Sequence, residues 1–185
     1  MNKQPEVTEA TRKRIIDAFW NLFKDLPVEK ITATMLSSEA GIHRSSFYRY
    51  FSDMYQVLDA FQAALLDDLK QETEAIQSST AVFLPEYSDK TAGVLLKYAD
   101  KIYRMLNYKD SDFREHFEGN VKPNIEKTLN INPDNPNAEF LSSFIISVML
   151  SNFNFWYEHK EHYELSQINA MGQQILLHGL SDLRE

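Results

Sequence analysis

Residues 31–51 read ITATMLSSEAGIHRSSFYRYF, and the interpretation of the whole chain starts from this stretch. Thr32 is a suitable N-cap for a short helix that carries Leu36. Gly41 suits the left-handed residue that commonly follows a helix end. A second short helix is expected from Arg44 to Tyr50. Two short helices joined by a glycine turn form a helix-turn-helix.

The polar side chains of this stretch are of the kinds that bind nucleic acids. In a helix-turn-helix, the second helix enters the major groove of double-stranded DNA and its opening residues face the base edges. Arg44 can bind guanine through two parallel hydrogen bonds, and Tyr48 and Arg49 suit the flanking phosphates. The candidate DNA contacts are Thr32, Thr34, His43, Arg44, Ser45, Ser46, Tyr48, Arg49 and Tyr50.

Charge is distributed unevenly along the chain, whose net charge is −8. Residues 1–50 contain 8 Lys and Arg against 6 Asp and Glu, whereas the rest contains 11 against 21. A chain this acidic does not bind polyanions nonspecifically, so any contact with nucleic acid must come from the N-terminal region. Arg12, Lys13 and Arg14 either approach a phosphate run or form an ordinary solvated helix start.

The remaining sequence predicts an all-helical chain. Its 5 Gly and 6 Pro argue against a turn-rich all-β fold, and apolar residues recur at helical spacing. Thr8 is a plausible first N-cap, and Asp53 opens a long helix with Gln56 as its capping-box partner. Beyond residues 31–51, the expected helices are 8–24, 53–77, 89–107, two short helices within 111–130 interrupted near Gly119 and Pro123, 138–159 and 165–183.

On these residues, the N-terminal region resembles the TetR-like (TetR/AcrR type) transcriptional regulators. The similarity covers about residues 15–58, and the run FYRYF at residues 47–51 is especially close to the family's version. The matching positions are Ile15, Ala18, Leu22, Phe23, Thr32, Leu36, Ala40, Gly41, Ile42, Arg44, Ser46, Phe47, Tyr48, Phe51 and Leu58.

The sequence departs from the family's pattern at three places. Met54 stands where the family usually has a Lys that bonds a backbone phosphate, so one phosphate anchor is missing. We therefore expect a lower or less salt-dependent affinity for DNA. His43 replaces the usual small capping hydroxyl, and Leu26-Pro27 ends the first helix in place of the family's Gly.

The resemblance implies both an architecture and a function. It implies a helix-turn-helix DNA-binding domain over residues 1–53 and an all-α effector-binding and dimerisation domain over residues 54–185, with about nine helices in all. It also implies a ligand-responsive regulator, by family habit a repressor, that binds a palindromic operator as a homodimer. The two recognition helices would enter successive major grooves about 34–36 Å apart. The alternative is a helical interaction protein that has lost DNA binding and acts through a protein partner.

The second region carries many aromatic residues. The residues alone favour core packing, whereas the resemblance implies a pocket for a small-molecule effector among the middle helices. The candidate lining residues are Tyr98, Ile102, Phe117, Phe144, Asn152 and Trp156.

Residues 140–157 form an uninterrupted run of 18 uncharged residues. That length meets the lower bound for a membrane span, but six Ser and Asn residues and weak flanking positive charge argue against one. A helix apolar on nearly every side is instead buried on nearly every side, which in a small domain requires a second subunit. We expect a four-helix bundle between two copies. The predicted interface residues are Ser143, Ser147, Ser151, Ile168, Gly172, Ile175 and Gly179.

Other classes of function are disfavoured. The absence of Cys excludes disulfides, thiolate zinc sites and cysteine nucleophiles. His159 and His162 lie beside Glu158 and Glu161, where a solvated helix end is expected rather than a metal site. No nucleophile elbow, phosphate-binding glycine loop or paired carboxylates appear, so neither an enzyme nor a cofactor is expected. The N-terminal residues lack the apolar segment of a signal peptide, which favours a cytoplasmic location.

Overall fold

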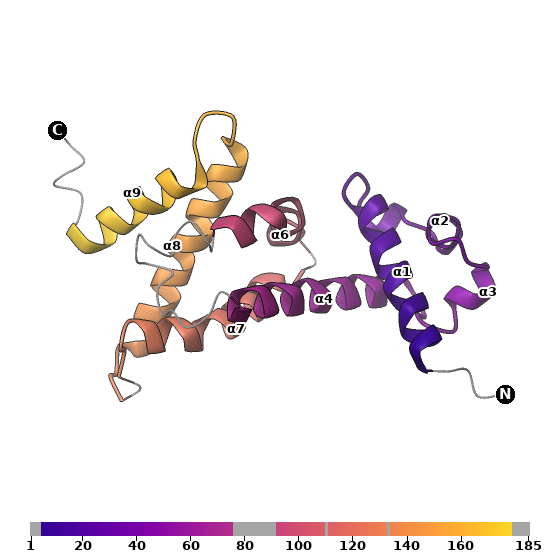
Figure 1. The fold of residues 1–185 in the computed structure, drawn as a ribbon, viewed down its shortest axis with the longest axis horizontal. Coiled ribbons are helices and arrows are strands. Elements are labelled where there is room, and N and C mark those ends of the chain that lie inside the picture. Colours follow the sequence, from indigo (N-terminus) through magenta and orange to yellow (C-terminus); the bar gives the residue numbers. More distant parts are fainter. Residues whose placement is uncertain (1–4, 76–91, 110, 133, 179–185) are drawn as a thin grey trace. The chain divides into compact units, whose positions relative to one another are not determined.

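The computed structural model describes residues 5–75, 92–109, 111–132 and 134–178 (Figure 1). Within these ranges the regular elements are helices, which confirms the predicted all-α fold class. The chain divides into two compact units, Met1–Asp67 and Asp68–Glu185. The elements are α1 (Pro5–Phe23), the 3-10 turn η1 (Val28–Lys30), α2 (Ala33–Glu39), α3 (Arg44–Phe47), α4 (Met54–Ala75), α6 (Ala99–Leu106), α7 (Phe113–Thr128), α8 (Ala138–Glu158) and α9 (Leu165–His178).

The first unit, which we call the head, is built around an aromatic core. Phe19 and Phe23 of α1 are fully buried, and their rings stack with centroids 5.2 Å apart. Phe61 of α4 lies parallel to the ring of Trp20 at 5.7 Å and tilted against Phe19 at 5.8 Å. The first part of α4 therefore packs as part of the head, although the domain boundary expected from the sequence precedes this helix.

Helix α1 begins at Pro5, before the N-cap expected at Thr8. Proline is tolerated in the first turn of a helix because the N–H that it lacks would have no acceptor there. The helix ends at Phe23, and Pro27 follows in an extended conformation with φ −69° and ψ 154°. The predicted stop at Leu26-Pro27 is therefore confirmed, whereas the predicted start is wrong.

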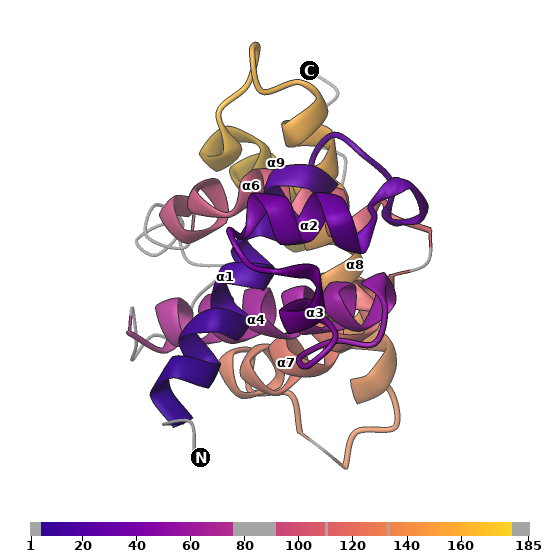
Figure 2. The same ribbon diagram turned by 90° about the vertical axis from the view of Figure 1, so that its right-hand side faces the viewer.

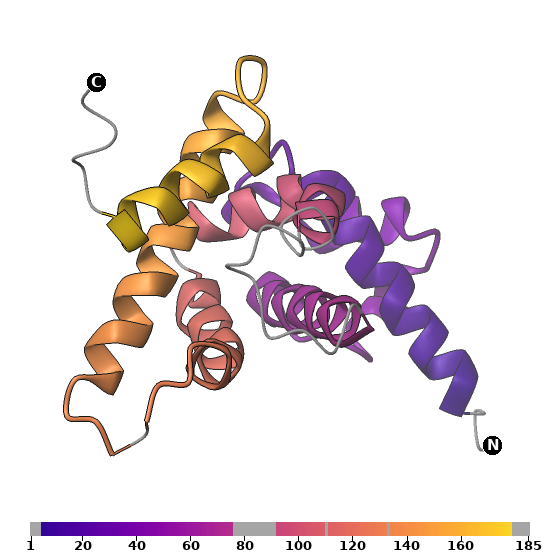
Figure 3. The same ribbon diagram turned by 60° about the vertical axis from the view of Figure 1, so that its left-hand side comes forward.

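The second unit, which we call the body, is organised around α8. This helix packs against α6, α7 and α9, and Figure 3 shows α9 lying along it. Ile125 of α7 and Ile146 and Leu150 of α8 form a buried apolar cluster. An ion pair between Lys122 and Glu139 also joins α7 to α8. The partly buried hydrophobic residues around the cluster are Leu106, Phe117, Val121, Ile145 and Met149.

Helix α7 is a single helix where the sequence predicts two short ones. Pro123 lies inside it and cannot donate the hydrogen bond that would reach the carbonyl of Gly119. The helix nevertheless continues because Phe117, Val121 and Ile125 recur every four residues and pack into the apolar cluster with α8. The predicted interruption is wrong because this packing outweighs the loss of one hydrogen bond.

The helix predicted over residues 89–107 is interrupted. Residues 92–97 are helical, Tyr98 adopts φ −110° and ψ 11°, and α6 then follows. Hydrogen bonds still run from Tyr98 N to Val94 O at 3.3 Å and from Ile102 N to Tyr98 O at 2.9 Å. The neighbouring side chains Tyr98 and Ala99 are both buried. Residues 89–91 lie outside the described part of the chain.

The two last helices follow the prediction closely. Helix α8 spans Ala138–Glu158 against an expected 138–159, and α9 spans Leu165–His178. Gly179 and the rest of the segment up to residue 183 lie outside the described residues. By length and composition α8 could cross a membrane, since its most apolar window has a mean hydropathy of 1.2, and 28% of that window is buried.

Candidate nucleic-acid interface

The helix-turn-helix is held by local contacts at both ends of α2. Thr32 adopts an extended conformation, and its side chain accepts a hydrogen bond from Met35 N at 3.2 Å, which confirms the predicted N-cap. Gly41 has φ +62°, as the turn requires. Arg14 of α1 donates from Nη2 to Ala40 O at 2.6 Å and to Gly41 O at 3.2 Å, so α1 secures the turn directly.

Helix α3 comprises Arg44–Phe47, which makes it shorter than the predicted segment that ends at Tyr50. Beyond Phe47 the backbone continues in tighter turns, with Arg49 N donating to Ser46 O and Tyr50 N to Phe47 O. Phe47 anchors the short helix to the core of the head. Its side chain is fully buried, and its ring stacks on the Phe51 ring with centroids 6.1 Å apart. The candidate recognition helix is thus a single helical turn that is anchored to the head through Phe47.

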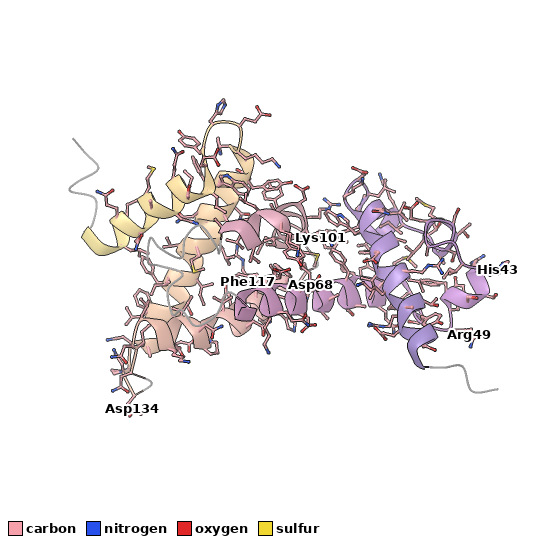
Figure 4. The ribbon with its side chains drawn as sticks, viewed as in Figure 1. His43, Arg49, Asp68, Lys101, Phe117 and Asp134 are labelled. Carbon is pink, nitrogen blue, oxygen red and sulfur yellow. The ribbon has the colours of Figure 1, made fainter. Side chains whose placement is uncertain are left out.

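The polar residues predicted to contact DNA come from α2, α3 and the residues that flank them, which face the viewer in Figure 2. Ser46 and Tyr50 are half-buried, and the others are exposed. Figure 4 shows His43 and Arg49 at the outer edge of the head. His43 precedes α3 without a side-chain capping hydrogen bond, so its imidazole is left on the surface. The exposed positions are Thr32, Thr34, His43, Arg44, Ser45, Tyr48 and Arg49.

Arg44 and Tyr48 form a pair on this surface. Arg44 Nη2 donates to Tyr48 Oη at 3.2 Å, and the guanidinium carbon lies 5.6 Å from the centroid of the Tyr48 ring. The Tyr48 ring in turn meets Phe47 edge-on, with centroids 5.2 Å apart. The arginine expected to read a base is therefore held by its neighbour one helical turn later.

The basic cluster at the start of α1 is largely engaged within the head. Arg14 bonds the end of α2, and Arg12 lies 5.6 Å from the Phe51 ring centroid and 3.8 Å from Glu9. Lys13 is exposed, and among the described residues it forms no ion pair. The head itself therefore engages Arg12 and Arg14, whereas Lys13 is exposed.

The start of α4 is capped by a carboxylate. Gln56 N donates to Asp53 Oδ1 at 2.9 Å, and Ser52 Oγ donates to Asp53 Oδ2 at the same distance. These hydrogen bonds, the one from Gln56 first, lower the pKa of Asp53 below 3.8. Ser52 N donates to Gln56 Oε1 at 3.0 Å, so the reciprocal bond of the predicted capping box is made by the residue before Asp53. Met54 is half-buried beside this negative charge.

The residues expected to line an effector pocket do not share one environment. Tyr98, Ile102 and Trp156 are buried, and Phe117 is partly buried against the cluster of α7 and α8. Asn152 is half-buried on α8 and lies against Gly172 of α9. Phe144 lies on an exposed face of α8 with 48% of its surface accessible, which separates it from the buried candidates.

The residues expected at a subunit interface also divide into two groups. Ser147, Ser151 and Ile175 are exposed, and Ser143 is half-buried. Ile168 is buried by its own chain, as is Gly172, where an added Cβ would lie 2.2 Å from Asn152 Nδ2. Gly172 therefore packs against Asn152 of α8 within one chain, and Ile168 is buried in the same chain.

Two tyrosines and two carboxylates form a polar contact between α6 and α8. The rings of Tyr103 and Tyr157 stack with centroids 4.0 Å apart. Tyr157 Oη donates to Asp100 Oδ1 at 2.6 Å, and Tyr103 Oη donates to Glu158 Oε1 at 3.0 Å. Burial, followed by the bond to Asp100, raises the pKa of Tyr157 to about 12. Because the partners are more than 50 positions apart in the sequence, no local pattern could have indicated them.

The histidines near the end of α8 make contacts of an ordinary kind. His159 stacks on Phe155 with ring centroids 4.4 Å apart, and its Nδ1 lies 2.8 Å from Phe155 O. Within the described ranges, no group of three or more His, Asp or Glu side chains is arranged to hold a metal ion.

The sequence matches no protein-family model and no curated protein. Similar solved structures do exist. A TetR-family transcriptional regulator from Streptomyces coelicolor is 16% identical, with a TM-score of 0.71 over 90% of this chain and 78% of that one. The fatty acid degradation regulator FadR from Bacillus halodurans is 17% identical, with a TM-score of 0.66 over 98% and 99%. FadR from Thermus thermophilus, a TetR-family repressor in complex with lauroyl-CoA, is 18% identical, with a TM-score of 0.56 over 91% and 94%.

These likenesses extend over nearly the whole chain, so they include the body as well as the head. At this level of identity they establish architecture, and they confirm the resemblance first seen in residues 15–58. The chain has the fold of the TetR-family transcriptional regulators.

Proposed function

We propose that this protein is a ligand-responsive transcriptional regulator that binds double-stranded DNA through its head. The observation that carries the proposal is the contrast within α3, where Arg44 and Ser45 are exposed and Phe47 is fully buried. A buried apolar side that anchors the helix and an exposed side of hydrogen-bonding residues without carboxylates suit recognition in the major groove. The fold of the whole chain supports the same function.

Binding to DNA phosphates should be weaker here than in a head with a lysine at position 54. The carboxylate of Asp53 occupies the start of α4, where it accepts the hydrogen bond of Gln56 N and repels a phosphate. Lys13 and Arg49 remain exposed as candidate phosphate contacts. We therefore expect few released counterions on binding and a shallow dependence of affinity on salt.

We further propose that two copies associate through α8 and α9. One face of α8 exposes residues 140, 144, 147, 151 and 155, which recur every three or four positions and so form one stripe. Phe140 is 67% exposed and Phe155 44% exposed, and α9 adds Met171 at 47%. Exposed aromatic and aliphatic side chains of this size, with Ser147 and Ser151 between the phenylalanines, are typical of surfaces that a protein partner covers. A two-fold symmetric four-helix bundle would cover the stripe on both copies.

The effector is proposed to be a small apolar molecule that binds within the body. Buried aromatic and aliphatic side chains such as Tyr98, Ile102 and Trp156 supply the right environment, and one structural neighbour is in complex with lauroyl-CoA. Such a ligand can regulate DNA binding only if it favours one arrangement of the two heads over another. Repression of a palindromic operator by a cytoplasmic homodimer is the form of regulation that we infer.

The test is selection of bound duplexes from random-sequence DNA at moderate salt, followed by titration of the purified protein with the recovered duplex. Arg44→Ala should reduce discrimination between the recovered and a scrambled duplex by about 1–3 kcal/mol. Arg114→Ala removes the same charge from an exposed position of α7 and should leave discrimination unchanged. If no duplex is enriched, the proposal is wrong.

The alternative is a helical interaction protein that no longer binds DNA. It is favoured by one specific feature, the acidic cap at Asp53 followed by Met54 where the family's phosphate-binding lysine would stand. This alternative predicts that wild-type protein shows no salt-dependent shift of any duplex. In that case, retention of the homodimer without DNA binding would favour a role through a protein partner.

A further inference from the structure

The pairing of Arg44 with Tyr48 suggests how a base contact is prepared before DNA arrives. Arg44 is the first residue of α3 and Tyr48 is its C-cap, so the two side chains lie one helical turn apart on the same face. Both are exposed, yet the guanidinium is bound twice, by the Tyr48 hydroxyl at 3.2 Å and by the face of the ring at 5.6 Å. An exposed arginine would otherwise sample many rotamers.

Tyr48 itself is held in place. Its ring meets Phe47 edge-on at 5.2 Å, and Phe47 is fully buried and stacks on Phe51. The backbone N–H of Tyr48 also donates to Ser46 O. The Tyr48 ring is therefore anchored to the core of the head through Phe47. Because the guanidinium of Arg44 contacts this ring and its hydroxyl, the position of the ring determines the orientation of the guanidinium.

The side chains of Arg44 and Tyr48 both keep hydrogen-bonding groups that can contact DNA. A guanidinium has five N–H donors, and the bond to Tyr48 uses one of them, so another edge remains for O6 and N7 of guanine. Because the Tyr48 oxygen accepts from Arg44, its own O–H is free to donate outward to a phosphate. Polarisation along such a chain strengthens each bond.

We propose that Tyr48 is a positioning residue that orients Arg44 for base readout. The inference rests on the proposed function of the head, and it assigns to Tyr48 a share of sequence discrimination in addition to any phosphate contact. If Tyr48 only contacted a phosphate, its loss would weaken binding to every sequence alike. A positioning role instead predicts a loss concentrated at the base pair that Arg44 reads.

The test compares wild type, Tyr48→Phe, Arg44→Ala and the double variant on the selected duplex and on duplexes with one base pair changed. Tyr48→Phe keeps the ring and its contact with Phe47 but loses the hydroxyl. At the base pair where Arg44→Ala abolishes discrimination, wild type should discriminate about 5- to 150-fold. There Tyr48→Phe should lose about 3- to 10-fold, and the double variant should match Arg44→Ala.

Tyr55→Phe removes an exposed hydroxyl from α4 and serves as the matched control, which should discriminate like wild type. The proposal is overturned if Tyr48→Phe weakens binding to all duplexes equally. It is also overturned if the double variant loses more discrimination than Arg44→Ala alone, by the factor that Tyr48→Phe costs in the wild-type background. Either result would reduce Tyr48 to a phosphate contact.

A second measurement needs no DNA and separates this inference from the proposed function. In 15N relaxation of the free protein, Nε of Arg44 should be more ordered than Nε of Arg49, and Tyr48→Ala should make Arg44 as mobile as Arg49. Equal mobility of the two arginines in wild type would overturn the inference. If Arg44 is ordered but no duplex binds, the positioning contact stands and the DNA-binding proposal fails.

Discussion

Most phenylalanines of helix α8 differ in burial from those of the head, although Phe153 of α8 is buried. In the head, Phe19, Phe23 and Phe47 are each 0% exposed, whereas on α8 Phe140, Phe144 and Phe155 are 67%, 48% and 44% exposed. The head therefore completes its core with its own residues, whereas the described part of the body leaves Phe140, Phe144 and Phe155 exposed on one face of α8.

This difference separates two uses of the hydrophobic effect in one short chain. In the head, burial stabilises the fold of a small unit and keeps the residues of α3 in a fixed orientation. On α8, the same kind of side chain can gain its burial energy only when a partner covers it. Substitutions in the two places should therefore change different observables, namely unfolding in the first and association in the second.

The largest effect is expected for Phe47→Ala. Removing a fully buried ring from beneath α3 should lower the free energy of unfolding by about 3–5 kcal/mol, because it leaves a cavity as well as losing burial. Urea denaturation of the two proteins measures this difference. Phe140→Ala is the matched control, and at concentrations where the protein is monomeric it should change stability by less than about 1 kcal/mol.

If Phe140→Ala destabilised the isolated monomer as much as Phe47→Ala, the contrast between the two regions would be lost. The exposed stripe of α8 would then be covered by its own chain in solution. Equal effects would also remove the main reason for proposing a second subunit.

The next largest effect is expected for Ser147→Arg, in the middle of the stripe. In a homodimer the substitution places two unpaired charges in the interface, one from each copy. This should weaken association by about 3 kcal/mol, which corresponds to an increase of about 150-fold in the dissociation constant. Sedimentation equilibrium of the purified protein measures the change. Because Ser147 is exposed in the single chain, the melting of the monomer should stay the same.

Asn120→Arg introduces the same charge on an exposed position of α7 and should leave the dimer intact. An unchanged dissociation constant for Ser147→Arg would place the subunit contact elsewhere. Gly172 is a poor site for this test because a side chain added there would have to displace the Asn152 side chain of its own chain, which would also change the packing of α9 on α8.

A smaller effect is expected for Gly41→Ala in the turn of the head. The residue has φ +62°, and an added Cβ would lie 3.1 Å from Arg14 Nη2, which holds the turn to α1. The strain should lower the free energy of unfolding by about 1–2 kcal/mol. Gly119→Ala is the control, because no atom lies within 4 Å of its added Cβ and the helix should become slightly more stable. Thermal unfolding of both variants checks the opposite signs.

Features that depend on a few neighbouring residues were predictable from the sequence. The cap at Thr32, the left-handed Gly41 and the bond from Gln56 to Asp53 all follow rules that span at most four positions. Most residues of the candidate nucleic-acid surface lie close together in the sequence, so the sequence alone was enough to propose them.

Features that depend on packing between distant segments were not predictable. Continuity of α7 through Pro123 is imposed by contact with α8, and the role of Arg14 at the end of α2 joins residues 26 positions apart. Phe144 was expected to line a pocket because aromatic content alone does not tell which face of α8 the chain covers. For the same reason the sequence could not separate Gly172 from the exposed positions of the stripe.

The smallest effect concerns the cap of α4 and its dependence on pH. Hydrogen bonds from Gln56 and Ser52 favour the charged form of Asp53, so its pKa in the folded head lies below the ordinary 3.8. Its stabilising contribution is complete above that value and disappears as the pH falls from about 4 toward the lowered pKa. Asp53→Asn keeps a good N-cap but cannot titrate, so its unfolding free energy should fall less steeply than that of wild type in this acid range.

Asp59→Asn removes the same charge from an exposed position of α4 and should keep the wild-type slope. The stripe of α8, whose five positions are all Phe or Ser, has no ionisable side chain. A steep loss of acid stability in the head alone would therefore sharpen the contrast between the regions, and parallel slopes for wild type and Asp53→Asn would show that the cap contributes nothing.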